Sequence, residues 1–190
     1  MPLIFSLGFM EIILVGGFAF AGFLVIGIVL WVTQRNSTAF QKKWTPPTGV
    51  GTPTQLRAIQ PSDPPIAPSA RWQGSDLFIR AHEPSTKSLF DLPLSNVEQC
   101  LITYRFKIQT DGNRTTVYPE MWCRLPEKGQ FFSRGVNCKV RETKDWTQIE
   151  IPFYLASGQQ ADLLHLNLVF EQPGAVRMKD IEVLSAPTKA

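Results

Sequence analysis

The first 33 residues of the chain almost entirely lack charge, because Glu11 is the one acidic or basic side chain among them. No second long apolar run follows, so a transporter with several membrane spans is excluded. A simple cytosolic enzyme is excluded as well, because it would not carry such an apolar N-terminal segment before a normally charged remainder, which we call the body. The formal net charge of +3 is too small to indicate a nucleic-acid partner.

Histidine and cysteine are also scarce, which limits the available chemistry. Of the two histidines, His82 and His165, the second has no evident nucleophile beside it, and no nucleophile elbow, zinc-protease, P-loop or dinucleotide-binding motif occurs. The three cysteines, Cys100, Cys123 and Cys138, show neither a CxxC nor a metal-ligand spacing. We expect Cys100 and Cys123 to be small core residues, with a disulfide as the alternative.

One uncharged run of 21 residues, 12–32, stands out in a chain without other helical periodicity. At ~1.5 Å per residue it would span roughly 30 Å, the thickness of a bilayer core. A cleaved signal peptide would instead show basic residues before a shorter apolar run. We therefore expect an N-terminal segment, 1–33, with a retained single-pass transmembrane helix at 12–32. Met10 is an alternative to Met1 as the start of this segment.

The residues within and beside this run bear on oligomerisation and orientation. Gly17 and Ala21 have the small-xxx-small spacing that favours helix packing, although small residues are common in all membrane spans. Arg35, Lys42 and Lys43 follow the run, and no basic residue precedes it. The positive-inside rule places the C-terminal body on the cytoplasmic side, with an extracytoplasmic body as the alternative. The expected partner is thus the lipid bilayer, with an oligomer formed through this helix as the alternative.

Proline is concentrated between the apolar run and the body. Seven of the 15 prolines fall between Pro46 and Pro68, among threonine, serine, glycine and glutamine. Because prolines lack a backbone donor and fix φ, we expect residues 34–70 to form an extended spacer without helix or inner strand. A PxxP ligand for a partner domain is the alternative.

Apolar and polar residues alternate along the body with the period of half-buried strands. The regular segments are 100–108, 117–125, 148–155, 164–170 and 176–183. A slip of phase near Lys179 and Asp180 predicts a β-bulge in the last of them. Less regular segments predict further strands at 75–80, 87–92 and 130–140. About eight short strands over residues 71–186 predict an all-β fold, a jelly-roll β-sandwich.

Residues 118–184 contain the segments YPEMWCRLP, FFSRG, TKDWTQIEIPFYL, LLHLNLVF and GAVRMKDIEVL. In this order they resemble the second half of carbohydrate-binding-module-like, galactose-binding-like jelly rolls. They are also similar to a set of bacterial membrane-anchored proteins that carry the same EMWC and DWT segments. The resemblance implies the fold and leaves the ligand open, because this fold serves many functions.

The resemblance also bears on a structural calcium ion. Many such modules have paired aspartates at the start of the last half-strand, where one of them helps to hold calcium. This chain has Lys179 and Asp180 there, so Asp180 is the candidate ligand and the lysine disfavours a cation. We therefore expect no cofactor, with structural calcium as the alternative.

A candidate ligand-binding face lies on the 117–125 segment, opposite the expected core. It carries Tyr118, Glu120, Trp122 and Arg124. Aromatic rings that stack on sugar C–H groups, flanked by a carboxylate and a guanidinium, suit a glycan. If the neighbouring strands share this sheet, they would add Arg105, Tyr154, His165 and Asn167. A protein contact and plain packing are the alternatives.

Three functions are compatible with these patterns. The leading one is a membrane-anchored, non-catalytic binding or interaction module whose ligand is a glycan or a protein partner. The first alternative is a structural or assembly subunit of a membrane complex. The second is an enzyme acting on glycans, which would need two carboxylates across a cleft. Glu120 and Glu150 could supply that pair, although two solvated strand residues are the simpler interpretation.

Overall fold

The computed structural model describes residues 48–111 and 115–188, which belong to one compact unit, Pro46–Ala190. The expected membrane span at 12–32 lies outside the described residues, as does its Gly17 and Ala21 packing pair. Within the described ranges, no helix is long and apolar enough to cross a membrane.

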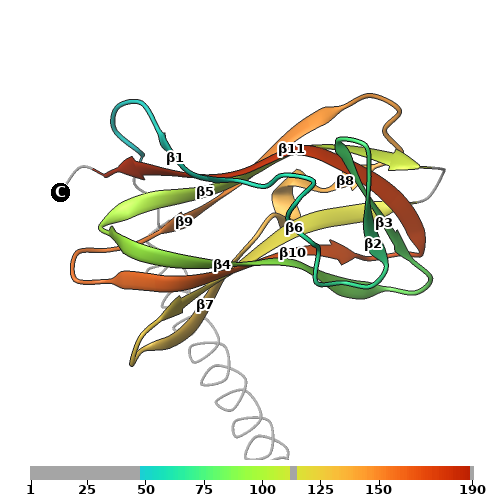
Figure 1. The fold of residues 1–190 in the computed structure, drawn as a ribbon. Coiled ribbons are helices and arrows are strands. Elements are labelled where there is room, and N and C mark those ends of the chain that lie inside the picture. The colour runs from blue at the N-terminus through green and yellow to red at the C-terminus, as the bar shows by residue number, and fades with distance from the viewer. Residues whose placement is uncertain (1–47, 112–114, 189–190) are drawn as a thin grey trace, which may run out of the picture. The chain divides into compact units, whose positions relative to one another are not determined.

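Two antiparallel sheets pack face to face (Figure 1). The six-stranded sheet has the order β2-β3-β11-β5-β9, with β1 also paired to β11. Its strands are β1 (Thr54–Ala58), β2 (Ala70–Gln73), β3 (Asp76–Ala81), β5 (Cys100–Asp111), β9 (Thr147–Tyr154) and β11 (Gly174–Pro187). The five-stranded sheet has the order β4-β10-β6-β7, with β8 paired to β6. Its strands are β4 (Ser85–Glu98), β6 (Thr116–Leu125), β7 (Gly129–Arg134), β8 (Val140–Arg141) and β10 (Gln160–Phe170).

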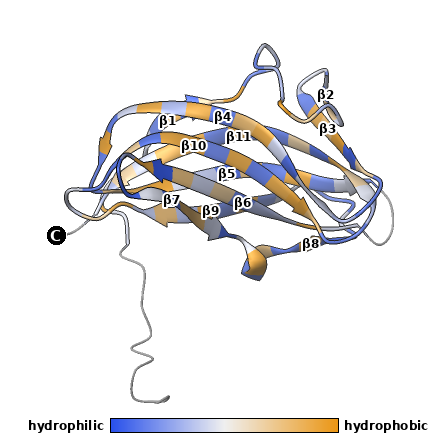
Figure 2. Cartoon of the chain, turned by 90° about the horizontal axis from the view of Figure 1, so that it is seen from below, coloured by the Kyte–Doolittle hydropathy of each residue, from blue (hydrophilic) through white to orange (hydrophobic). Residues whose placement is uncertain are grey.

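The all-β sandwich predicted from the alternating segments is confirmed, and the core lies between the two sheets. The strands carry alternating hydrophilic and hydrophobic bands (Figure 2) because successive side chains point to opposite faces. Tyr104, Phe106, Leu164, Leu166 and Phe170 are among the fully buried core residues. The burial of each therefore follows the phase of its predicted strand.

The expectation that residues 34–70 are an extended spacer outside the body is wrong for the second part of this range, which belongs to the sandwich. β1 pairs with β11, from Thr54 opposite Ser185 to Ala58 opposite Glu182. Ile59 and Ala67, which follow β1, are buried in the core. The prolines flank the TQLRA segment instead of interrupting it, and β1 pairs with a single strand, so proline does not prevent this strand.

The details of the later strands are partly confirmed. The expected bulge is present, because the register of β11 against β5 shifts between Lys179 and Glu182 and Asp180 has a φ of 52°. The strands expected at 75–80 and 87–92 correspond to β3 and part of β4. The strand expected at 130–140 ends at Arg134, and a 3-10 turn, Val136–Cys138, follows it before β8.

The atoms around Gly135 leave no room for a side chain at this position. A Cβ atom there would lie 2.6 Å from Cys138 Sγ, 2.7 Å from Pro119 Cγ and 2.8 Å from Ile151 Cγ2. We expect Gly135→Ala to lower the free energy of unfolding by about 1–3 kcal/mol in urea titrations. Val136→Ala is the matched control, because Val136 is 48% exposed and its truncation should change stability by about 0.5 kcal/mol or less. Equal stability of the two variants would contradict the packing at Gly135.

The cysteines give a second test of the core. All three are free; Cys100 and Cys123 are buried, as expected, and Cys138 is partly exposed. Burial, with smaller contributions from Asp162 and Cys100, raises the pKa of the Cys123 thiol to about 12. Since the thiolate is the reactive form, we expect alkylation of the native chain at pH 8 to reach Cys138 first. Cys100 and Cys123 should react only after denaturation, and equal rates for all three would contradict this core.

Candidate functional site

The outer face of the five-stranded sheet gathers most of the residues predicted for the ligand site. On β6, side chains alternate between the core and this outer face, because neighbouring positions point to opposite sides. We call the outward residues of β4, β10, β6 and β7 the Trp122 face. They are Asp91, His165, Asn167, Tyr118, Glu120, Trp122, Arg124, Gln130, Phe132 and Arg134.

Two cross-strand rows organise the Trp122 face. In the first, Asp91, His165, Trp122 and Phe132 lie opposite one another on four consecutive strands. In the second, the order is Ser88, Asn167, Glu120 and Arg134. Side chains in direct register are close enough to interact, so each row places side chains from four strands next to one another.

Glu120 is the centre of this face and is only 4% exposed. Its Oε1 accepts hydrogen bonds from Trp122 Nε1 at 2.6 Å and from Asn167 Nδ2 at 3.3 Å. Its Oε2 accepts from Arg134 Nε, with which it also forms an ion pair. The carboxylate thereby fixes side chains from three strands at once.

The charge state of Glu120 follows from these contacts. Burial alone would raise its pKa, but the hydrogen bonds from Trp122, Arg134 and Asn167 and the charge of Arg134 outweigh burial. The pKa of Glu120 therefore lies below its ordinary value, and the group is ionised at neutral pH. An ionised carboxylate with three donors acts as an anchor and has no proton to give.

An aromatic pair lies beside this anchor. The ring centroids of Trp122 and Phe132 are 5.1 Å apart, with 47° between the ring planes. Phe132 is 51% exposed, and Trp122 is partly exposed although its indole N–H is committed to Glu120. The Arg134 guanidinium lies 4.5 Å from the Phe132 ring centre. Because the indole edge is held, the rings present a preorganised aromatic surface to solvent.

Polar groups flank the aromatic pair on both sides. His165 Nδ1 lies 2.6 Å from Asp91 Oδ1, and His165 Nε2 lies 3.4 Å from Gln130 Nε2. Arg124 makes a two-point contact with Asp162, at 2.8 Å through Nε and 2.9 Å through Nη2. These side chains can exchange hydrogen bonds with hydroxyl groups of a ligand resting on the rings.

The expectation that Arg105 and Tyr154 join this site is wrong. Both lie in the six-stranded sheet, on β5 and β9, where Arg105 forms an ion pair with Glu182 at 2.8 Å. Glu150 is also on β9, so it lies in the other sheet from Glu120 and cannot form a carboxylate pair with it across one cleft. Alternation along a strand gives the face of a residue, but strand pairing decides its sheet.

The calcium candidate has a different partner in the structure. Asp180 Oδ2 lies 2.9 Å from Lys107 Nζ, so a lysine already faces this carboxylate. Among residues 48–111 and 115–188, no three His, Cys, Asp or Glu side chains are grouped as a metal site would require.

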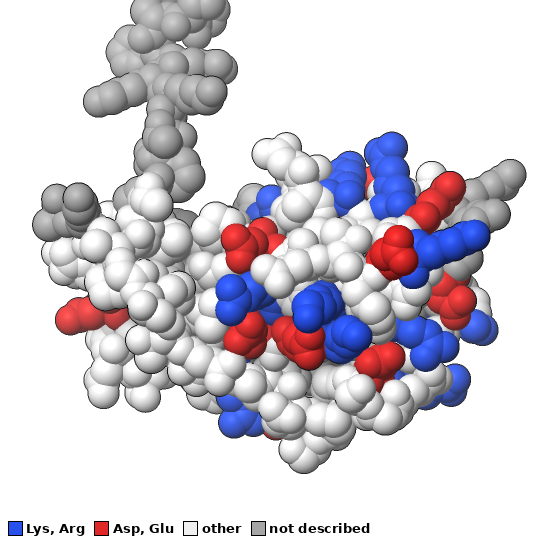
Figure 3. Space-filling view, turned by 90° about the horizontal axis from the view of Figure 1, so that it is seen from above, with Lys and Arg blue, Asp and Glu red and all other residues white. Residues whose placement is uncertain are grey.

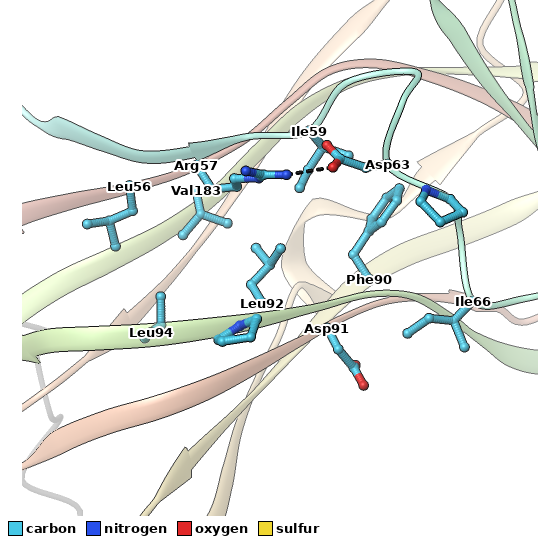
Figure 4. A pocket seen from close by; sticks show the side chains of 12 residues that line it. Leu56, Arg57, Ile59, Asp63, Ile66, Phe90, Asp91, Leu92, Leu94 and Val183 are labelled. Atoms are coloured by element: carbon cyan, nitrogen blue, oxygen red, sulfur yellow. Dashed lines mark hydrogen bonds and ion pairs between the residues drawn. The ribbon is translucent and has the colours of Figure 1, made fainter.

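A groove of ≈ 630 Å³ opens between β1, the segment after it and β4 (Figure 4). Leu56, Ile59, Phe90 and Leu92 are among its mainly apolar lining residues. Its charged groups do not converge on a ligand, because Arg57 and Asp63 pair with each other and Asp91 points away from the groove. We therefore place the candidate site on the Trp122 face.

Sequence reasoning missed Asp91, Gln130, Phe132 and Arg134. Gln130, Phe132 and Arg134 could have been predicted, because the short turn between β6 and β7 sets the register of these two strands. With Leu125 opposite Gly129, Phe132 must lie opposite Trp122 and Arg134 opposite Glu120. Asp91 had no such signal, since β4 and β10 are far apart in the chain.

Comparisons with known proteins give the fold. No protein-family model and no curated protein sequence matches this chain. The CBM22-1 xylan-binding domain of Paenibacillus barcinonensis Xyn10C is similar with a TM-score of 0.52 and 12% identity, over 74% of this chain and 99% of that domain. A CBM4 structure is similar with a TM-score of 0.45 and 12% identity, over 64% of this chain and 77% of that chain. The mannan-recognising module TmCBM27 is similar with a TM-score of 0.44 and 10% identity, over 73% of this chain and 100% of that module. The described part of the chain thus shares the β-sandwich fold of carbohydrate-binding modules.

Proposed function

We propose that this chain is a non-catalytic carbohydrate-binding module that holds a glycan across the Trp122 face. One observation carries the proposal: the partly exposed Trp122–Phe132 pair is held in place by the buried, ionised Glu120. A sugar ring presents C–H groups on its faces and hydroxyl groups on its rim. The aromatic pair suits the former, and Arg134, His165 and Gln130 suit the latter.

The same contacts argue against a glycan-cleaving enzyme. Glycoside hydrolysis needs a carboxylic acid with a raised pKa and a second carboxylate across the scissile bond. Glu120 has a lowered pKa and accepts hydrogen bonds from three side chains, and Glu150 belongs to the other sheet. The arrangement supports binding, and Glu120 and Glu150 do not form the acid pair that cleavage would need.

Affinity electrophoresis of the full chain tests the proposal. The fold resemblance to a xylan-binding domain makes xylan the first probe, with mannan and a soluble β-glucan as further neutral polysaccharides. We expect at least one polysaccharide to retard the chain without any release of reducing ends. Unchanged mobility in all three would contradict glycan binding, and release of reducing ends would contradict a non-catalytic module.

We further propose that residues 12–32 tether this module to a lipid bilayer. The support is the uncharged run of 21 residues and the basic residues that follow it. Protease treatment of sealed inside-out vesicles measures the side: digestion of the body would place it in the cytoplasm, as the charge pattern predicts. Recovery of the whole chain in the soluble fraction would contradict the tether.

A second candidate function is protein contact through β7, the last strand of its sheet. Phe131 is 44% exposed and points to the opposite side of β7 from Phe132. An exposed aromatic residue on an edge strand is a feature of interaction surfaces. This observation favours the assembly-subunit alternative, in which Phe131→Ser would disrupt a complex without weakening glycan binding.

A further inference from the structure

Three arginines surround one buried aromatic ring on the outer face of the six-stranded sheet. Arg71 on β2 and Arg177 on β11 both lie in register with Phe78 on β3. Arg80 is two residues farther along β3 and therefore lies on the same face. The guanidinium carbons of Arg71, Arg80 and Arg177 lie 5.4, 5.5 and 5.7 Å from the centre of the Phe78 ring. We call these three residues the arginine cluster.

The arginine cluster has no carboxylate partner within ion-pair distance among the residues that the structure describes. Its one side-chain hydrogen bond there goes to an uncharged acceptor, from Arg177 Nη1 to Gln73 Oε1 at 3.3 Å. Four other arginines in the described ranges form ion pairs with carboxylates, and Arg141 does not; the four are Arg57, Arg105, Arg124 and Arg134. Positive and negative side chains are interspersed on the face seen in Figure 3.

Three like charges gathered around one ring repel one another. The ring attracts each guanidinium, by about 0.5–1 kcal/mol at an exposed site, but it does not neutralise their charge. The strands hold them in this arrangement through backbone pairing on both sides of β3. An anion bound between them would supply the missing countercharge.

A shallow hollow of ≈ 200 Å³ lies at the arginine cluster. Arg71 and Arg80 reach it from two strands, and Phe78, Ser69 and His82 also line it. Arg71, Arg80 and His82 are exposed, whereas Phe78 is 6% exposed. The hollow therefore combines a fixed aromatic surface with accessible nitrogen and hydroxyl donors.

We propose that the arginine cluster binds a phosphoryl group. A carboxylate has two oxygens in one plane and matches a single guanidinium fork. A phosphate monoester carries close to two negative charges and three acceptor oxygens that point in different directions, which suits the Arg71 and Arg80 guanidinium groups that reach the hollow from two strands, with the charge of Arg177 beside them. The group can belong to a soluble phosphate ester or to a phospholipid headgroup. This site lies on the opposite sheet from the Trp122 face and does not depend on glycan binding.

Isothermal titration calorimetry of the full chain with inorganic phosphate, at constant ionic strength, tests the proposal. We expect saturable one-site binding that Arg80→Gln weakens about tenfold and that the triple Arg71→Gln, Arg80→Gln, Arg177→Gln variant abolishes. Arg141→Gln removes the same charge from β8 in the other sheet and should leave binding unchanged. Absence of saturable binding, or equal weakening by Arg141→Gln, would overturn the site. Unchanged thermal unfolding of the variants excludes misfolding as the cause.

Calorimetry of the full chain in detergent micelles distinguishes the two sources of the phosphoryl group, because the apolar run at 12–32 would carry the chain into vesicles of any composition. Micelle-dispersed phosphatidic acid and soluble glycerol phosphate are the probes. Tighter binding of phosphatidic acid that Arg80→Gln weakens and that free phosphate competes away assigns the site to a lipid headgroup. Phosphate binding without a preference for phosphatidic acid assigns it to a soluble phosphate ester.

Discussion

Replacing Trp122 by alanine is expected to weaken glycan binding roughly 30-fold while the sandwich stays folded. A partly exposed tryptophan at the centre of a binding surface typically contributes about 2 kcal/mol or more, which corresponds to that factor. Trp122 is also the ring that Glu120 holds, so its loss removes both the larger aromatic surface and one bond to the anchor. Affinity electrophoresis against the polysaccharide that retards the wild-type chain measures this effect.

The neighbouring strand offers a matched pair of controls for this prediction. Phe132 and Phe131 are adjacent, 51% and 44% exposed, and point to opposite sides of β7. We expect Phe132→Ala to weaken glycan binding and Phe131→Ala to leave it unchanged. Equal effects of the two truncations would show that β7 contributes only nonspecific hydrophobic contact, and would contradict a site confined to the Trp122 face.

Replacing Glu120 by alanine is expected to lower the free energy of unfolding by about 3 kcal/mol. The substitution leaves the Trp122 indole N–H and the Asn167 amide without their acceptor, and it removes the ion-pair partner of Arg134. The side chain of Arg134 is 45% exposed and can turn to water, so the part-buried Trp122 donor and the buried Asn167 donor account for most of the loss. Chemical denaturation measures it, and a loss below about 1 kcal/mol would contradict the anchoring role.

The stability of the chain should also depend on pH through Glu120. Its pKa is lowered in the folded state, so the unfolded state binds the proton more readily and stability rises with pH across this interval. The contribution is fully present above the ordinary glutamate pKa of about 4.3 and is lost as pH falls through the folded value. Glu120→Gln cannot titrate, so its stability should fall less than that of the wild type below about pH 4.3. If the free energy of unfolding falls equally with pH in the wild type and in Glu120→Gln, the lowered pKa of Glu120 is contradicted.

Much of the fold was predictable because strand alternation is a local signal. The buried phase of Ile102, Tyr104 and Phe106 on β5 follows directly from their spacing. The bulge at Asp180 was visible for the same reason, since an extra residue shifts the phase of every position after it. Tyr118, Glu120, Trp122 and Arg124 share one outward face through the same alternation.

The remainder depends on contacts between distant segments, which alternation does not encode. Arg105 has the periodicity of the site residues, yet β5 pairs with β9 and β11 and carries it into the other sheet. The strand at Thr54–Ala58 was hidden because its flanking prolines dominate the local composition, whereas its pairing with β11 is long-range. Glu120 was expected to be a solvated strand residue, and only the convergence of Trp122, Arg134 and Asn167 buries it.

The indole N–H resonances of the full chain, followed by NMR during titration with a soluble xylo-oligosaccharide, test glycan binding at the Trp122 face most directly. A Trp122→Phe variant assigns the Trp122 signal, and Trp72 in the six-stranded sheet is the internal reference, with its own N–H bound to the Asp63 carbonyl oxygen at 2.8 Å. We predict a saturable shift of the Trp122 signal while the Trp72 signal stays in place. A saturable shift confined to Trp72 or Trp146, or no shift with this or with mannan and β-glucan oligosaccharides, would contradict the proposed site.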